Sequence, residues 1–135
     1  MADRPLSPHL SVYRMYRYSV LTSITNRFTG VVLSIGLIVL VYWLMAAAEG
    51  AGAYERALGV LSSGPFKVIF LIVLAAFSYH LLAGIRHLIW DSGRGLERAQ
   101  SQRSAWLIGI AALVLFAGLA WWTHLHWAAG AAGRP

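Results

Sequence analysis

The chain contains no cysteine. It therefore forms no disulfide, offers no thiolate nucleophile and holds no cysteine-ligated iron–sulfur cluster of its own. Charged residues are also scarce: they make up 12% of the 135 residues, whereas soluble domains carry about 25%. With 59% hydrophobic residues and a mean hydropathy of +0.63, a soluble chain of this length could not bury its apolar surface. The composition predicts a membrane protein.

The sequence also argues against a secretory signal and against a nucleic-acid-binding function. No apolar segment precedes the polar, aromatic start of the chain, so we expect no secretory signal there. The net charge of +6 would suit a nucleic-acid-binding protein, but the basic residues cluster at the ends of apolar runs. That placement is typical of a signal for membrane orientation, and it predicts no nucleic-acid partner.

Three long apolar runs are present, and they predict an all-α membrane protein with three transmembrane helices at about residues 23–49, 66–90 and 105–127. Residues 1–22 are expected to form a cytoplasmic or interfacial segment. Residues 128–135 are expected to be a mobile tail. The glycine-rich connection after the first span has room for a short helix at about residues 54–61.

The distribution of basic residues predicts the orientation of the spans. Eight of the eleven Lys and Arg residues lie at the N-terminal side of the first span or around the second loop. Cytoplasmic loops carry such an excess. We therefore expect a multi-pass protein of the bacterial inner (cytoplasmic) membrane with its N-terminus in the cytoplasm.

The end of the second span carries ionisable residues where hydrocarbon normally excludes them. At about 100° per residue, His80, Gly84, His87 and Asp91 share one helix face. Ionisable groups at membrane depth indicate a functional site, and imidazole is the commonest metal ligand. The glycine between the histidines would let a flat prosthetic group approach the backbone. The alternative is a pair of buried histidines that only bond neighbouring helices.

A b-type haem suits this pattern, but one chain cannot complete it. Such a haem needs axial nitrogens on opposite faces of the ring, whereas His80 and His87 lie about 10 Å apart along one helix. His124 of the third span lies at a different depth. If His80 is an axial ligand of the iron, the other ligand comes from a second polypeptide, and the three spans are half of a haem-binding bundle.

Polar residues at the start of the first span should meet this region, because both lie at the cytoplasmic face. Arg27, with Ser23 one turn earlier, is placed to hold an anionic or carbonyl oxygen. Arg27 and Arg86 are also placed to pair with haem propionates. The alternative for Arg27 is a snorkelling arginine that only sets orientation.

Three segments, residues 4–13, 23–30 and 80–91, resemble the cytochrome b membrane-anchor subunits of succinate dehydrogenase (succinate:quinone oxidoreductase). The resemblance covers nearly the whole chain. It implies that His80 is the axial ligand of a haem b shared with a second three-helix anchor subunit. It implies that Ser23 and Arg27 line a ubiquinone pocket, and that Arg27, Arg86 and His87 serve the haem propionates.

The same resemblance implies an iron–sulfur subunit and a flavoprotein subunit as further partners. Succinate would be oxidised there, because this chain has no glycine-rich flavin-binding motif. One position departs from the family pattern: Asn26 stands where a histidine is usual. Asparagine forms hydrogen bonds but cannot carry a proton, so a role of this position in proton delivery or propionate pairing is in doubt.

Two other functions compete with the haem-binding anchor. A haem-less structural anchor would use the histidines only to bond helices together. A proton or solute carrier would use His80 and His87 as a relay; the lack of an evident internal repeat weighs against it.

Overall fold

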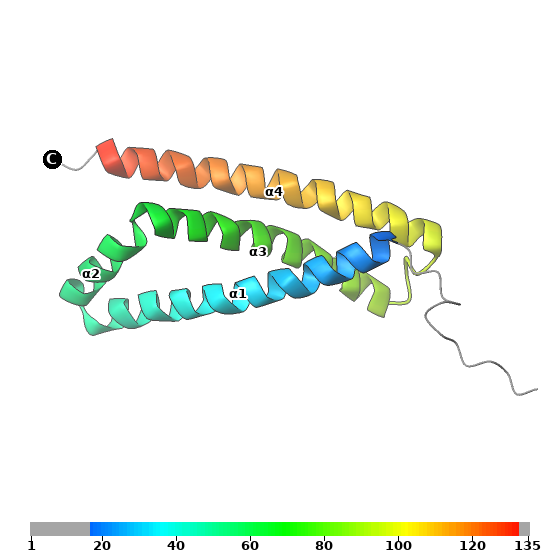
Figure 1. The fold of residues 1–135 in the computed structure, drawn as a ribbon, viewed down its shortest axis with the longest axis horizontal. Helices are drawn as coiled ribbons and strands as arrows, with labels where there is room; N and C mark the ends of the chain where they lie inside the picture. Colours follow the sequence, from blue (N-terminus) through cyan, green and yellow to red (C-terminus); the bar gives the residue numbers. More distant parts are fainter. Residues whose placement is uncertain (1–16, 133–135) are drawn as a thin grey trace, which may run out of the picture.

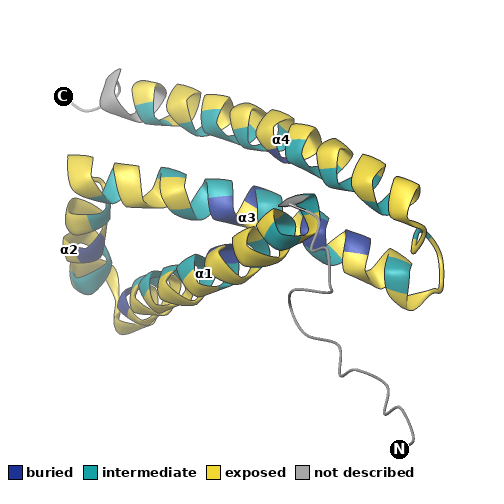
Figure 2. Cartoon of the chain, turned by 45° about the vertical axis from the view of Figure 1, so that its right-hand side comes forward, coloured by how far each residue is buried: buried dark blue, intermediate teal, exposed yellow. Residues whose placement is uncertain are grey.

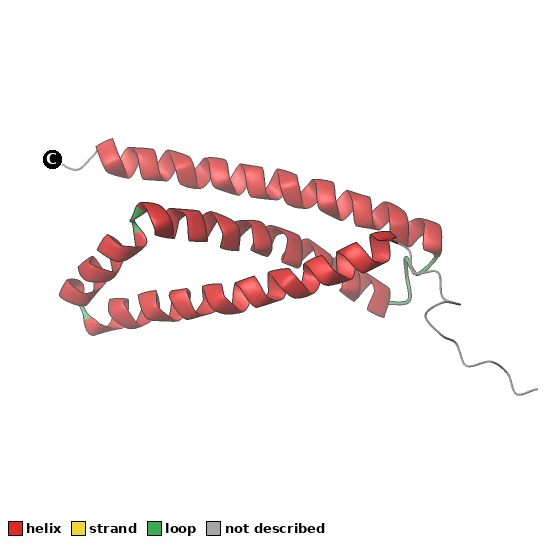
Figure 3. Ribbon diagram, in the orientation of Figure 1, coloured by secondary structure: helices red, strands yellow, loops and turns green. Residues whose placement is uncertain are grey.

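The computed structural model describes residues 17–132, and the side chains of residues 18–128. Within this part of the chain every element is a helix (Figure 3). The helices are α1 (Arg17–Glu49), α2 (Ala51–Leu61), α3 (Gly64–Asp91) and α4 (Arg98–Ala132). Three of them, α1, α3 and α4, are long and apolar enough to cross a membrane. The expected all-α membrane fold with three spans is therefore confirmed.

The helix ends follow from local sequence. Gly50 separates α1 from α2 with φ +118°, a backbone conformation that L side chains rarely adopt. Pro65 lies in the first turn of α3, where its missing N–H has no helical partner to lose. Gly93 and Gly95, with φ +77° and +73°, turn the chain between α3 and α4.

All three long helices extend beyond the predicted spans, α3 by only a few residues and the other two by more. The first helix already begins at Arg17, inside the segment assigned to the interface, because neither proline nor glycine interrupts residues 17–29. The last helix runs from Arg98 to Ala132, into both the expected loop and the expected tail. Residues 128–132 are therefore helical, as their alanine-rich sequence favours.

The helices follow an up-and-down path (Figure 1). The start of α1, the end of α3 and the start of α4 lie at one end of the molecule, and α2 joins α1 to α3 at the other. We call these the α1-start end and the α2 end. The main interhelical contacts are those of α3 with α4 and with α1. Helix α3 is therefore the central element of the chain.

Small residues let α1 approach α3. A Cβ atom at Gly36 would lie only 2.8 Å from Cγ1 of Val73, and one at Gly30 would lie 3.3 Å from Cε1 of His80. Glycine at these contacts gives the close backbone approach typical of membrane helix pairs. The second contact brings the His80 ring against α1.

Little of the apolar surface is covered within the chain. Only 6%, 17% and 6% of the most apolar windows of α1, α3 and α4 are buried, and Figure 2 shows exposed residues along the outer faces of these helices. Since such surface is unfavourable in water, lipid or other membrane subunits must cover it.

Candidate functional site

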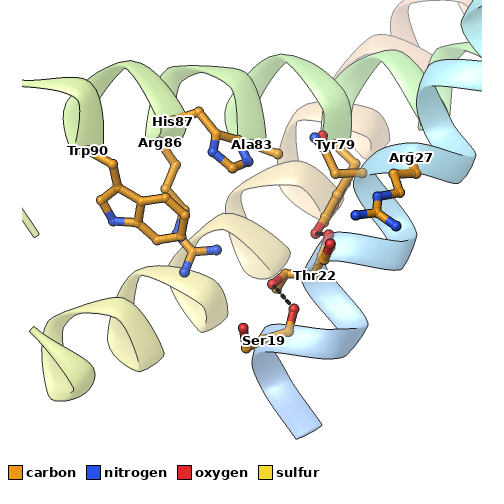
Figure 4. A pocket seen from close by; sticks show the side chains of 10 residues that line it. Ser19, Thr22, Arg27, Tyr79, Ala83, Arg86, His87 and Trp90 are labelled. Atoms are coloured by element: carbon orange, nitrogen blue, oxygen red, sulfur yellow. Dashed lines mark hydrogen bonds between the residues drawn. The ribbon is translucent and has the colours of Figure 1, made fainter. Parts of the chain in front are cut away.

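A cavity of about 390 Å³ lies at the α1-start end, between the first turns of α1 and the last turns of α3 (Figure 4). We call it the interhelical cavity. Its lining residues are Ser19, Thr22, Ser23, Asn26 and Arg27 of α1, and Tyr79, Ala83, Arg86, His87 and Trp90 of α3. The volume falls in the range of about 300–1,000 Å³ that small-molecule sites usually occupy.

Four residues singled out from the sequence line this cavity together: Ser23 and Arg27 from α1, and Arg86 and His87 from α3. Ser23, Arg27 and His87 are exposed in the chain, whereas Arg86 is buried. In Figure 4 the side chains of Arg86 and His87 extend from α3 into the space beside α1. One wall of the cavity is thus a fixed, buried cation, and the rim carries a second cation and a hydroxyl.

Arg86 is fixed by contacts with α4 and with its own helix. Its Nη2 donates to the carbonyl oxygen of Ser101 at 2.9 Å and to the Ser101 hydroxyl at 3.1 Å. Its guanidinium carbon lies 4.0 Å from the ring centroid of Trp90, within the range of a cation–π contact. The indole Nε1 of Trp90 in turn donates to the Gly95 carbonyl at 3.0 Å. These contacts tie the loop and the start of α4 to the end of α3.

Two buried side-chain polar atoms have no hydrogen-bond partner within the described part of the chain: Nε of Arg86 and Oδ1 of Asn26. Both residues line the interhelical cavity. A buried polar group without a partner is costly and needs an explanation. A polar ligand in the cavity that accepts from Arg86 and donates to Asn26 would supply the missing partners.

His80 does not line this cavity, but α1 holds its ring. Nδ1 of His80 lies 3.1 Å from the Thr29 hydroxyl and 3.2 Å from the Asn26 carbonyl oxygen. The ring is partly buried. Its Nε2 forms no hydrogen bond with any residue that the structure describes. Fixing one ring nitrogen while leaving the other available is how metal-binding histidines are commonly held.

The rest of the His80 face is open. No atom outside the local backbone lies within 4 Å of a Cβ built at Gly84, and His87 and Asp91 are exposed. Open space therefore lies beside Gly84, which a flat group on this face would need. Within the described residues no three His, Cys, Asp or Glu side chains are grouped as a metal site.

The face of α1 that meets α3 differs from the one singled out in the sequence. Ser23 and Arg27, the α1 residues that the sequence assigned to the site, are both exposed. The hydrogen bonds between α1 and α3 come instead from the series Thr22, Asn26 and Thr29.

These contacts were missed because periodicity identifies a face but not the direction in which it points. The carbonyl oxygen of Thr22 accepts from the Tyr79 hydroxyl at 3.4 Å, while Asn26 and Thr29 contact His80. The sequence signal that could have identified this face is the spacing of small polar residues at i, i+4 and i+7 in the first turns of the span.

The other histidines of the described chain lie apart from the site. His124 and His126 are exposed near the far end of α4. Their rings lie 6.2 Å and 5.4 Å from those of Trp121 and Trp122. Each is thus paired with a tryptophan neighbour on its own helix.

Comparison with known proteins identifies the family. Residues 2–119 match the family model described as the succinate dehydrogenase/fumarate reductase transmembrane subunit. The succinate dehydrogenase cytochrome b556 subunit of Paracoccus denitrificans is 42% identical over 113 residues, which are 84% of this chain and 86% of that protein. The same subunit of Rickettsia felis is 34% identical over 112 residues, covering 83% of this chain and 86% of the relative.

The similarity extends to mitochondria. The cytochrome b560 subunit of mouse mitochondrial succinate dehydrogenase is 34% identical over 117 residues, covering 84% of this chain and 66% of the mouse protein. The three helices that are long and apolar enough to span a membrane agree with the description of the family as a transmembrane subunit. The chain therefore belongs to the family of succinate dehydrogenase/fumarate reductase transmembrane subunits.

Proposed function

We propose that this chain is the haem b-binding membrane anchor of a succinate:quinone oxidoreductase and helps to pass electrons from an iron–sulfur subunit to ubiquinone. The observation that carries the proposal is the interhelical cavity. There two cations and a hydroxyl converge, and a buried donor and a buried acceptor lack hydrogen-bond partners among the residues that the structure describes. Relatives named as cytochrome b subunits of succinate dehydrogenase support it.

Haem b would be held by His80 through its Nε2. The ring already has the features of an axial ligand, since Nδ1 is fixed by α1 and the adjacent Gly84 leaves open space. Bound haem would supply a one-electron carrier beside the quinone pocket. The second axial ligand would come from a sister three-helix anchor subunit, because the other described histidines are two turns away on α3 or at the far end of α4.

The haem propionates would be neutralised by Arg27, Arg86 and His87. The Nε of Arg86 has no partner among the described residues, and a carboxylate would satisfy it through a charge-assisted hydrogen bond. Its other contacts, with Ser101 and Trp90, fix the guanidinium before the ligand arrives. Such preorganisation reduces the entropy lost on binding.

Ubiquinone would bind at the rim of the cavity, with a carbonyl oxygen accepting from Ser23 and Arg27. An arginine suits this position because it stays charged at every physiological pH and stabilises negative charge that develops on the carbonyl oxygen. Both side chains are exposed in this chain alone. The pocket would therefore be closed by partner subunits, which would exclude water and strengthen these interactions.

The exposed spans suit an anchor with several partners. Apolar surface on α1, α3 and α4 would contact membrane lipid and the sister anchor. Soluble iron–sulfur and flavoprotein subunits would dock at the α1-start end. The excess of basic residues at this end supports a location in the bacterial cytoplasm under the positive-inside rule. The N-terminus would then be cytoplasmic.

The proposal is tested with the assembly purified through this chain. Reduced-minus-oxidised visible spectra are recorded for the wild type, His80→Ala and the matched control His124→Ala. We expect a b-type signal in the wild type and the control, and none in His80→Ala. An intact wild-type assembly without haem would reject the cofactor, and a full signal in His80→Ala would reject the ligand.

Quinone binding is tested separately by succinate:quinone reductase activity of Ser23→Ala. We expect the activity to fall while haem content stays at the wild-type level. The matched control is Ser62→Ala, an exposed serine at the α2 end. Equal activity in the two variants would exclude Ser23 from the quinone pocket.

A further inference from the structure

Thr29 is the buried side chain that contacts His80. It is 7% exposed. Its hydroxyl lies 2.9 Å from the carbonyl oxygens of both Thr25 and Asn26. Carbonyl oxygens only accept hydrogen bonds, so the single hydroxyl proton of Thr29 is directed at them. The hydroxyl oxygen then presents a lone pair to Nδ1 of His80, 3.1 Å away.

The second neighbour of Nδ1 constrains the ring in the same way. The main-chain oxygen of Asn26 lies 3.2 Å from Nδ1, and it too can only accept. Both partners of Nδ1 are therefore acceptors, and both contacts require a proton on Nδ1. One N–H is shared between two oxygens, an arrangement that is common near helix backbones.

The tautomer follows from this arrangement. In a neutral imidazole with its proton on Nδ1, Nε2 carries the free lone pair. Gly30 makes the contact possible, because a Cβ there would lie 3.3 Å from Cε1 of His80. The Nδ1–Cε1 edge of the ring is thus pressed against α1, and Nε2 is the nitrogen left for a ligand.

We infer that Thr29 is a positioning residue for the haem ligand: its hydroxyl accepts from Nδ1–H of His80, supports the tautomer that exposes Nε2 and lowers the reduction potential of an iron bound there. This inference rests on the proposed function. When the ring nitrogen that does not bind the metal donates a hydrogen bond, the imidazole becomes a stronger electron donor, which favours the oxidised iron. Because Thr29 is buried within a membrane helix pair, water does not compete for the bond.

The two acceptors play different parts. The Asn26 carbonyl belongs to the main chain, so it holds the tautomer whatever side chain stands at that position. Thr29 is the part of the arrangement that a substitution can remove. Thr29→Val keeps the branched shape and deletes the hydroxyl, so it should leave the haem bound and change its potential. Thr29→Ser keeps the hydroxyl and should behave as the wild type.

The test is a potentiometric titration of the b-type absorbance in the purified assembly, for the wild type, Thr29→Val, Thr29→Ser and the matched control Thr25→Val. Thr25 is an exposed threonine one turn earlier on α1. We expect the midpoint potential to rise in Thr29→Val and to stay at the wild-type value in Thr29→Ser and Thr25→Val. Where Thr29→Val does not assemble, Thr29→Ala is compared with Thr29→Ser in the same way.

The outcomes separate this inference from the proposal on which it rests. A wild-type assembly without haem rejects the proposed function itself. A wild type with haem, together with an unshifted potential in the variants that lack the hydroxyl, rejects only the role of Thr29. A shift of equal size in Thr29→Ser also rejects it, because the hydroxyl would then not be the cause.

Discussion

The two ends of this helical bundle contain similar residue types but use them differently. At the α1-start end, His80 and Arg86 are partly or fully buried and bonded to other helices. At the α2 end and the far end of α4, His124, His126 and Arg56 are exposed. The polar residues that contacts between helices bury and fix in orientation thus lie at the end of the molecule that holds the candidate site.

The largest expected effect comes from filling the open space beside the His80 face. Gly84→Leu should abolish the b-type signal, because the side chain would occupy the volume next to the ligand. Gly118→Leu is the control, since a Cβ at either glycine meets nothing within 4 Å. The haem content of the two purified variants, compared by visible spectra, tests this. Equal haem content in the two variants would show that the space beside Gly84 is not needed for haem binding.

A smaller but still large effect is expected for the cation at the cavity rim. Arg27→Gln should lower succinate:quinone reductase activity about 100-fold, the usual effect of losing one donor that stabilises developing charge. Arg56→Gln, an exposed arginine at the α2 end, should leave the rate unchanged. The measurement is kcat with a soluble quinone, with haem content determined in parallel. An unchanged kcat in Arg27→Gln would mean that Arg27 only helps to set the membrane orientation and does not act on the quinone.

The packing between α1 and α3 supplies a third comparison. Gly36→Ala should destabilise the assembly by about 1–3 kcal/mol, since its Cβ would lie 2.8 Å from Val73 and overpacking costs energy of this order. Gly118→Ala lacks such a neighbour and should be neutral or slightly stabilising. Thermal unfolding of the two assemblies checks the difference. A similar Tm for both would mean that Val73 moves aside without cost.

The smallest expected effect concerns the link between Arg86 and α4. Ser101→Ala removes one of the two acceptors of Arg86 and leaves the Ser101 carbonyl in place. The expected loss is about 1 kcal/mol, seen as a small decrease in Tm with quinone reductase activity retained. The exposed Ser92→Ala, in the loop, is the control. A large loss of activity in Ser101→Ala would show that Arg86 depends on this hydroxyl for its orientation in the cavity.

The sequence predicted the three spans well because long apolar runs have few alternatives to membrane helices. It missed the first turns of α1 and α4, since polar residues such as Ser19 and Gln100 reveal no boundary when no glycine or proline interrupts them. The gathering of Ser23, Arg27, Arg86 and His87 at one end followed from chain direction and charge alone. The contacts of Thr22 and Thr29 with α3 did not, because they depend on the rotation of α1 about its axis.

The hydrogen bonds of the site also imply an order of folding. Arg86 and Ser101 are 15 positions apart in the chain, whereas Thr29 and His80 are 51 apart. Contacts between near neighbours in sequence close smaller loops and form sooner. The hairpin of α3 and α4 should therefore form first, and α1 should dock afterwards. The Nδ1 atom of His80 gains its two partners on α1 only in that last step, so a truncated or half-folded chain would present the imidazole without its fixed orientation.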